Sequence, residues 1–453
     1  MWDDRTPMIL ITFDGLGDRP ADELGNQTPL EAAVTPNLDE LTRIGVSGIH
    51  QPFGPGRATS SERSHWAMFG QTQTFPGRAL LEATGMGIEI ADERPHFHLA
   101  LRPAEIRDGQ LHAVGRVSAE DSADCLDLFD ALRVMPHELN PVLHPLRNGE
   151  CILESAALSS YEISDSDPLF GHLHPVLQPL PLDAAADQKA AQESAELMTS
   201  WLSSAIKMLR DHPINKARRE SGKLELIAPV TKWASFKTQL NSFEKVTGLT
   251  GAAVTSSALY RGLAATLEMT QLHIPSDLEN IQEDFEARIQ AGIELSKTHS
   301  FVHIHTKATD EAGHTKSPSL KRDVIESLDR ACNELLALAE TTTIVITGDH
   351  ATPSTGGVMH SAHPTSIILA GPHVHSDEAT VCGERSHKFG DLGRVSARDI
   401  LPLMSHYSHR ASFKGHATGS YETIALPDNP IALDFSETHN KNQVTQINRT
   451  GSK

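Results

Sequence analysis

The stretch MILITFDG, residues 8–15, is a run of apolar residues that ends directly in an aspartate. Two later stretches follow a similar pattern, FVHIHTKATD at residues 301–310 and TIVITGDH at residues 343–350. Near-continuous apolar strands are typical of a parallel sheet that helices cover on both faces. Ligands of such sheets bind beyond the carboxyl ends of the strands. The three stretches therefore predict an α/β fold that gathers polar side chains at one edge of its sheet.

The size and composition of the chain narrow the class of protein. A chain of 453 residues with 39% hydrophobic residues is long enough for two domains. Its formal charge of -20 argues against nucleic acid and acidic membranes as partners, because both attract basic surfaces. The apolar run near the N-terminus is too short to cross a bilayer and has no basic leader, and the four scattered cysteines form no CxxC pair. We therefore expect a cytoplasmic protein without a membrane or nucleic-acid partner.

The strand-like stretches lie toward the two ends of the chain, and a long region with its own helix and strand signals separates them. Within it, residues 189–213 have the spacing of an amphipathic helix that stops at Pro213. FHLALRP and ECILESAALS have the composition of strands. We predict a discontinuous core made of residues 1–74 and 276–427, an inserted α+β domain at 75–275 that forms a substrate-binding lid, and a polar tail at 428–453.

Carboxylate and imidazole side chains follow the predicted strands in close spacing. Asp310 and His314 lie four residues apart, Asp349 and His350 are adjacent, and His360 follows ten residues later. A single strand-end aspartate is more often a helix cap, and a single loop histidine more often faces solvent. The cluster, however, has the mixed oxygen and nitrogen ligands that suit a divalent metal such as Zn or Mn.

The segment PGRATSSERSHWAMFG, residues 55–70, supplies hydroxyl groups next to a predicted helix. Ser60 or Ser61 would lie at the helix N-terminus, where backbone N–H groups and the helix dipole favour an anion. A hydroxyl there could act as a metal-activated nucleophile. Serine is also an ordinary N-cap residue, so the residues alone leave both interpretations open.

Six segments, in this order, resemble the archaeal-type cofactor-independent phosphoglycerate mutases of the alkaline phosphatase superfamily. They are FDGLGDRP (13–20), NQTPLEAAVTPNLDELTRIG (26–45), SSERSHWAMFG (60–70), GRALLEATGMGIEI (77–90), ATDEAGH (308–314) and TGDHATP (347–353). The resemblance covers about the first 90 residues and the region from about 300 to 400. It implies an alkaline-phosphatase-like core, with a mostly parallel sheet between helices, and an inserted lid domain. It also implies metal-dependent phosphoryl transfer on a small phosphorylated acid.

The resemblance assigns a role to each matching position. Ser61 aligns with the family's nucleophile, which becomes phosphorylated during the reaction. Two divalent ions are implied, with Mn as the first choice and Zn, Mg or Co as other possibilities. The implied ligands are Asp14, Asp349, His350 and Ser61 for one ion, and Asp310, His314 and His360 for the other.

The chain departs from this family at the positions that hold the substrate. LHAVGR, residues 111–116, keeps Arg116 but has His112 and Ala113 in place of two arginines. Lys232 aligns with a further family arginine, and Arg261 stands where the family tends to have lysine. Arginine and lysine are not equivalent here, because only the guanidinium group offers a planar, bidentate fork. We assign Arg116, Lys232, Arg261 and His112 to substrate binding.

These departures leave two enzymatic functions open. The first is a phosphoglycerate mutase-like isomerase that interconverts 2-phosphoglycerate and 3-phosphoglycerate, a step of glycolysis. The second is a metal-dependent phosphohydrolase or mutase that acts on another small phosphorylated or phosphonylated acid. A non-catalytic scaffold is disfavoured because the implied ligand set is complete, and a sulfatase is disfavoured because serine stands at the nucleophile position.

Overall fold

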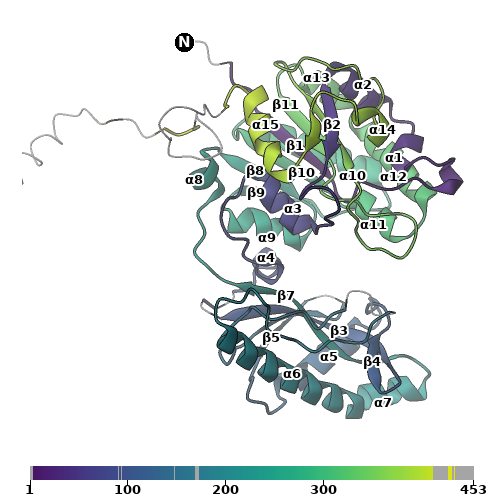
Figure 1. Cartoon of the computed structure of the whole chain (residues 1–453), viewed down its shortest axis with the longest axis vertical. Helices are drawn as coiled ribbons and strands as arrows, with labels where there is room; N and C mark the ends of the chain where they lie inside the picture. The colour runs from purple at the N-terminus through teal and green to yellow at the C-terminus, as the bar shows by residue number, and fades with distance from the viewer. Residues whose placement is uncertain are drawn as a thin grey trace, which may run out of the picture.

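A computed structural model describes residues 4–411, 427–430 and 433, except for 90, 93, 147 and 169–172. Two sheets organise these residues, and they lie in separate lobes of the molecule (Figure 1). The larger sheet has eight strands in the order β13-β2-β12-β11-β1-β10-β8-β9. Its strands are β1 (Met8–Phe13), β2 (Val46–His50), β8 (Gly251–Thr255), β9 (Thr270–His273), β10 (Phe301–Thr306), β11 (Thr343–Thr347), β12 (Thr365–Ala370) and β13 (Gly393–Val395).

The apolar stretches at 343–350, 8–15 and 301–310 contain the adjacent strands β11, β1 and β10. Strand β1 pairs in parallel with β10 on one side and with β11 on the other. Only β12 runs against its neighbours, β11 and β2, among the described strands of this sheet. The predicted α/β fold with a mostly parallel sheet is confirmed.

Helices bury both faces of the sheet, which explains why the strands are apolar at nearly every position. Along β1, Ile9 and Ile11 join one hydrophobic cluster, whereas Met8 and Leu10 join a second cluster on the opposite face. Helices α2 (Pro36–Ile44), α10 (Ile281–Ser296), α12 (Pro318–Ala331) and α13 (Asn333–Leu338) contribute to the first cluster. Helices α3 (Ser61–Met68), α4 (Arg78–Gly85), α9 (Ala258–Thr266) and α15 (Ile400–Tyr407) contribute to the second.

Short helices complete this lobe. They are η1 (Asp22–Leu24), α1 (Pro29–Ala32), α8 (Phe243–Thr247), α11 (Ala308–His314), α14 (Glu384–His387) and η2 (Ala397–Asp399). Helix α1 begins with a capping box, in which the Thr28 hydroxyl accepts a hydrogen bond from the Glu31 N–H and the Glu31 carboxylate accepts one from the Thr28 N–H. Helix α11 follows β10 and carries two of the predicted metal ligands.

The second lobe is built on an antiparallel sheet. Its strands are β3 (Pro95–Arg107), β4 (Gln110–Ala113), β5 (Val142–Pro145), β6 (Glu150–Glu154) and β7 (Glu225–Phe236). Helices α5 (Ser122–Arg133), α6 (Gln188–Asp211) and α7 (Pro213–Glu220) belong to the same lobe (Figure 1). The helix expected at 189–213 is α6, which buries Trp201 in the core of this lobe. Helix α6 ends just before Pro213, as expected, and Pro213 is the first residue of α7.

The sheet topology places part of the predicted lid in the core. Strands β8 and β9 fall within the 75–275 region, but β8 pairs in parallel with β10 and extends the larger sheet. Helix α4 packs on α9 of the same lobe. The second sheet therefore spans only residues 95–236, because strand pairing rather than composition sets the boundary. The predicted polar tail lies outside the described residues except for 428–430 and 433.

Candidate active site and metal centre

The predicted strand-end residues converge at the carboxyl edge of the larger sheet. Asp14 follows β1, Asp349 and His350 follow β11, and Asp310 lies in α11 just after β10. The side chains of all four are buried. Gly15 allows this approach: it has a φ of +66°, and a Cβ there would lie 2.4 Å from the Thr352 hydroxyl.

One group of donors surrounds the Ser61 hydroxyl. Atoms of Asp14, Asp349 and His350 lie within 4.8 Å of one another, close enough for one ion after small adjustments. His350 Nε2 is 3.2 Å from Asp14 Oδ1 and 3.5 Å from Asp349 Oδ2. Ser61 Oγ lies 3.0 Å from His350 Nε2 and 3.3 Å from Asp14 Oδ1. This is the ligand set that the resemblance assigns to one ion.

A second group of donors is formed by Asp310, His350 and His360, again within 4.8 Å of one another. His314 Nε2 lies 3.3 Å from Asp310 Oδ1, but His314 does not belong to this group. The rings of His350 and His360 stack with centroids 3.9 Å apart. The structure therefore brings all the implied ligands together but places His350 between the two groups, whereas the resemblance gives it to one.

Charge and burial at this edge favour bound cations. Burial alone would lower the pKa of His350, but the carboxylates of Asp349 and Asp14 raise it to about 9. Burial, reinforced by the Asp14 carboxylate, raises the pKa of Asp349. Asp349 Oδ2 is buried and accepts no hydrogen bond from the described residues. Buried carboxylates with unused lone pairs and an adjacent imidazole fit divalent metal ions, which would replace the protons that the cluster otherwise holds.

The geometry distinguishes the two candidate serines. Ser60 is the N-cap residue of α3, and its hydroxyl donates a hydrogen bond to Glu62 Oε1 at 2.6 Å. Ser61 is the first residue of the helix, and its hydroxyl points to the metal-ligand group instead. Both residues line a cavity of about 520 Å³ that also reaches His314 and His360. Ser61 is therefore the better candidate for the nucleophile.

Tyr260 and His305, which contact the Asp14 carboxylate, were not predicted. The Tyr260 hydroxyl donates a hydrogen bond to Asp14 Oδ2 at 2.8 Å, and His305 Nε2 lies 3.2 Å from the same oxygen. The centroids of the Tyr260 and His305 rings lie 3.5 Å apart. Both side chains are buried, and they fix the orientation of a carboxylate expected to bind metal. The sequence signal was a pair of histidines inside an otherwise apolar strand.

A second cavity, of about 650 Å³, adjoins the first and collects cations from both lobes. Arg116, Lys232 and Arg261 line it, as the substrate-binding assignment requires. His112 lines neither cavity, so its assignment to the substrate pocket is not supported; it lies on β4, opposite Glu105 of β3. Three further cations that line the cavity were not predicted: Arg78, Arg102 and Lys307. Lys307 Nζ also lies 3.1 Å from Asp310 Oδ2 and so links the two sites.

Trp233 is one of the residues that line both cavities. The β3–β7 pairing is irregular here, and Trp233 has a φ of +54°, a conformation that favours glycine. Arg78 Cζ lies 3.8 Å and Lys232 Nζ 4.1 Å from the centre of its ring. The strained backbone thus holds the indole ring against two of the cations that line the second cavity.

Comparison with known proteins agrees with this geometry. Residues 6–406 match the model of the metalloenzyme superfamily. A 2,3-bisphosphoglycerate-independent phosphoglycerate mutase of Thermoplasma volcanium is 32% identical over 413 residues, which cover 90% of this chain and 98% of that protein. The chain belongs to this mutase family. A family member from Methanocaldococcus jannaschii is 31% identical over 442 residues, covering 94% of this chain and 99% of that protein.

Two solved structures have a similar fold. The cofactor-independent phosphoglycerate mutase from Thermoplasma acidophilum is 28% identical, with a TM-score of 0.56, and covers 89% of this chain and 99% of its own. A protein from Pyrococcus horikoshii is also 28% identical, with a TM-score of 0.72 over 91% of this chain and all of that one. Membership of the mutase family confirms the resemblance and makes the protein a metalloenzyme. Among the described residues, no helix of this family member is long and apolar enough to cross a membrane.

Proposed function

We propose that the protein is a phosphoglycerate mutase that interconverts 2-phosphoglycerate and 3-phosphoglycerate through a phosphorylated Ser61. The observation that carries the proposal is the position of the Ser61 hydroxyl. It lies against one metal-ligand group and at the wall of a cavity that continues into a cluster of cations. A small acid fits this arrangement, because its phosphoryl group would bind beside Ser61 and its carboxylate would bind among the cations.

The chain's residues then have separate tasks. Two divalent ions, for which we favour Mn over Zn, Mg or Co, would lower the pKa of the Ser61 hydroxyl and neutralise the phosphoryl charge. Ser61 Oγ forms a bond to phosphorus as the bond to the glycerate oxygen breaks. The glycerate then reorients, and its other hydroxyl oxygen takes the phosphoryl group back as the Oγ–P bond breaks.

The second lobe serves as a lid in this reaction. Arg102, Arg116 and Lys232 come from that lobe, whereas Arg78, Arg261 and Lys307 come from the lobe of the larger sheet. Cations from both sides can hold the glycerate while it reorients and can keep water from Ser61. We further propose a cytoplasmic location, which four buried free cysteines support.

The product of the reaction tests this function. Purified enzyme supplied with Mn and 3-phosphoglycerate should form 2-phosphoglycerate with little free phosphate. Release of phosphate without isomerisation would favour the alternative, a metal-dependent phosphohydrolase. No reaction in either direction would indicate that the substrate is another small phosphorylated or phosphonylated acid. Lys232 would contribute to such a difference, because it lacks the bidentate fork of an arginine.

Replacing Arg116 by alanine should weaken the binding of the glycerate intermediate by the second lobe. We expect less isomerised product and more free phosphate, because a glycerate that escapes leaves the phosphoryl group to water. A lost charge-assisted hydrogen bond costs roughly 1.5 to 3 kcal/mol, or about ten- to a hundredfold in the partition between products. The measurement is the ratio of 2-phosphoglycerate to phosphate. Arg107→Ala, which removes an exposed arginine of the same lobe, is the matched control.

Trp233→Gly should change substrate binding without unfolding the protein. Glycine accepts a positive φ at no steric cost, so the backbone stays in place while Arg78 and Lys232 lose the indole ring. Two cation–π contacts of about 0.5 to 1 kcal/mol each predict a KM for the glycerate that rises about fivefold to thirtyfold. Steady-state kinetics with Trp233→Phe as the control measure this. An unchanged KM would show that the ring does not position the cations.

A further inference from the structure

A second cluster of metal-ligating side chains lies far from the catalytic centre. Asp4 precedes β1, His373 follows β12 and His409 follows α15. Asp4 and Asp14 flank β1, whose six residues span about 20 Å. Strand β12 ends where β11 begins, so His373 also lies at the amino edge of β1 and β11. The cluster is therefore at the edge opposite the active site.

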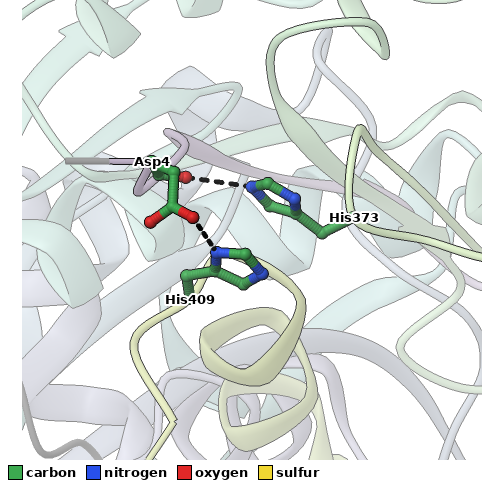
Figure 2. Close-up of side chains that lie close together, drawn as sticks. All are labelled: Asp4, His373 and His409. Carbon is green, nitrogen blue, oxygen red and sulfur yellow. Dashed lines mark hydrogen bonds and ion pairs between the residues drawn. The ribbon is translucent and has the colours of Figure 1, made fainter. Parts of the chain in front are cut away.

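Three chain segments point donors at one place (Figure 2). His409 Nδ1 lies 2.9 Å from Asp4 Oδ2, and His373 Nε2 lies 2.9 Å from the Asp4 backbone oxygen. The two imidazole rings stack with centroids 3.6 Å apart and an angle of 15° between their planes. A carboxylate oxygen and one nitrogen of each ring lie within 4.8 Å of one another.

Backbone hydrogen bonds tie together the segments that carry Asp4 and His409. His409 has a φ of +61°, in the left-handed region that few residues other than glycine adopt. The Arg410 N–H donates a hydrogen bond to the Ser405 carbonyl at 2.7 Å and holds this turn at the end of α15. The Thr6 N–H donates to the Ser408 carbonyl, which ties the segment of Asp4 to the same turn.

We propose that Asp4, His373 and His409 bind a divalent transition metal ion such as Zn²⁺. Two imidazoles and one carboxylate suit Zn, Ni, Cu or Co, whereas Mg and Ca prefer oxygen ligands alone. Ligands about 2.0 to 2.1 Å from an ion lie at most about 4.2 Å apart, so these side chains, two exposed and one partly buried, need to move only slightly. The exposed position leaves room for water as a further ligand. The ion would replace the proton between Asp4 and His409 and join the N-terminal segment to α15.

Metal counting tests this site independently of the catalytic function. Mn-loaded enzyme dialysed against Zn²⁺ should retain one more metal equivalent than the His409→Asn and Asp4→Asn variants. Asparagine accepts the backbone conformation of residue 409, so the turn should survive the change. His375→Gln removes an exposed histidine two residues along the chain from His373 and should bind as much metal as the wild type.

Thermal unfolding gives a second readout. Zn²⁺ should raise the Tm of the Mn-loaded wild type more than that of either variant, while turnover with Mn stays the same for all of them. Equal metal content in the wild type and both variants would overturn the proposal. So would a Zn²⁺-dependent rise in Tm that the two variants retain in full.

Discussion

Replacing Ser61 by alanine is expected to abolish turnover while the protein stays folded. The change removes the atom that would accept the phosphoryl group and leaves every carboxylate and imidazole of the two donor groups in place. Loss of a nucleophile in covalent catalysis lowers kcat by roughly 10⁴-fold or more. Steady-state assays in both directions, with circular dichroism and metal analysis of the same samples, measure the effect.

Ser60→Ala is the matched control for this prediction. Ser60 is the neighbouring N-cap residue, but its hydroxyl bonds to Glu62 rather than to the metal ligands. We expect this variant to keep most of its activity. If Ser60→Ala inactivates the enzyme and Ser61→Ala does not, the nucleophile is one residue away from the position that we assign.

Removal of metal ions is expected to have an effect of similar size. A chelator should abolish activity and added Mn should restore it, since the buried carboxylates cannot bind a phosphoryl group without a counter-charge. The pKa of His350 is raised to about 9 in the metal-free cluster. The imidazole must lose its proton to coordinate, so apparent metal affinity should fall as the pH drops below about 9. Activity that survives verified metal removal would contradict this prediction.

His360→Ala tests how the two donor groups divide the ions. His360 belongs only to the group with Asp310, whereas Asp14 and Asp349 belong to the other. We expect the variant to lose about one of two metal equivalents. Asp349→Asn should deplete the other group instead. Equal loss from both groups in both variants would show that the ions bind only as a pair.

The convergence of the candidate metal ligands could be predicted from the sequence because these residues obey a local rule. Asp14, Asp310 and Asp349 each follow a buried strand, and carboxyl ends of parallel neighbours meet at one edge. Apolar runs without alternation already indicate that both faces of the sheet are covered. The fold class and the position of the candidate site can therefore be predicted from local patterns, namely an apolar run and the aspartate that follows it.

The cavity that cations from both lobes line was harder to predict because its residues meet through long-range packing. Arg78 lies on α4 of one lobe and Arg102 on β3 of the other, and only the fold brings them to one cavity. An irregularity in the β3–β7 pairing sets the position of Trp233, and no local sequence pattern predicts such an irregularity. The assignment of β8 to the lid region was wrong for the same reason, since pairing with β10 places it in the core.

The most direct test is to identify the phosphorylated residue during turnover. Enzyme mixed with Mn and 3-phosphoglycerate, quenched in acid within one turnover and digested, should yield a peptide containing Ser61 that is heavier by one phosphoryl group. Fragmentation should place that group on Ser61, and Ser61→Ala should yield no such peptide. Turnover to 2-phosphoglycerate without any phosphorylated serine, or with the group on Ser60, would contradict the account.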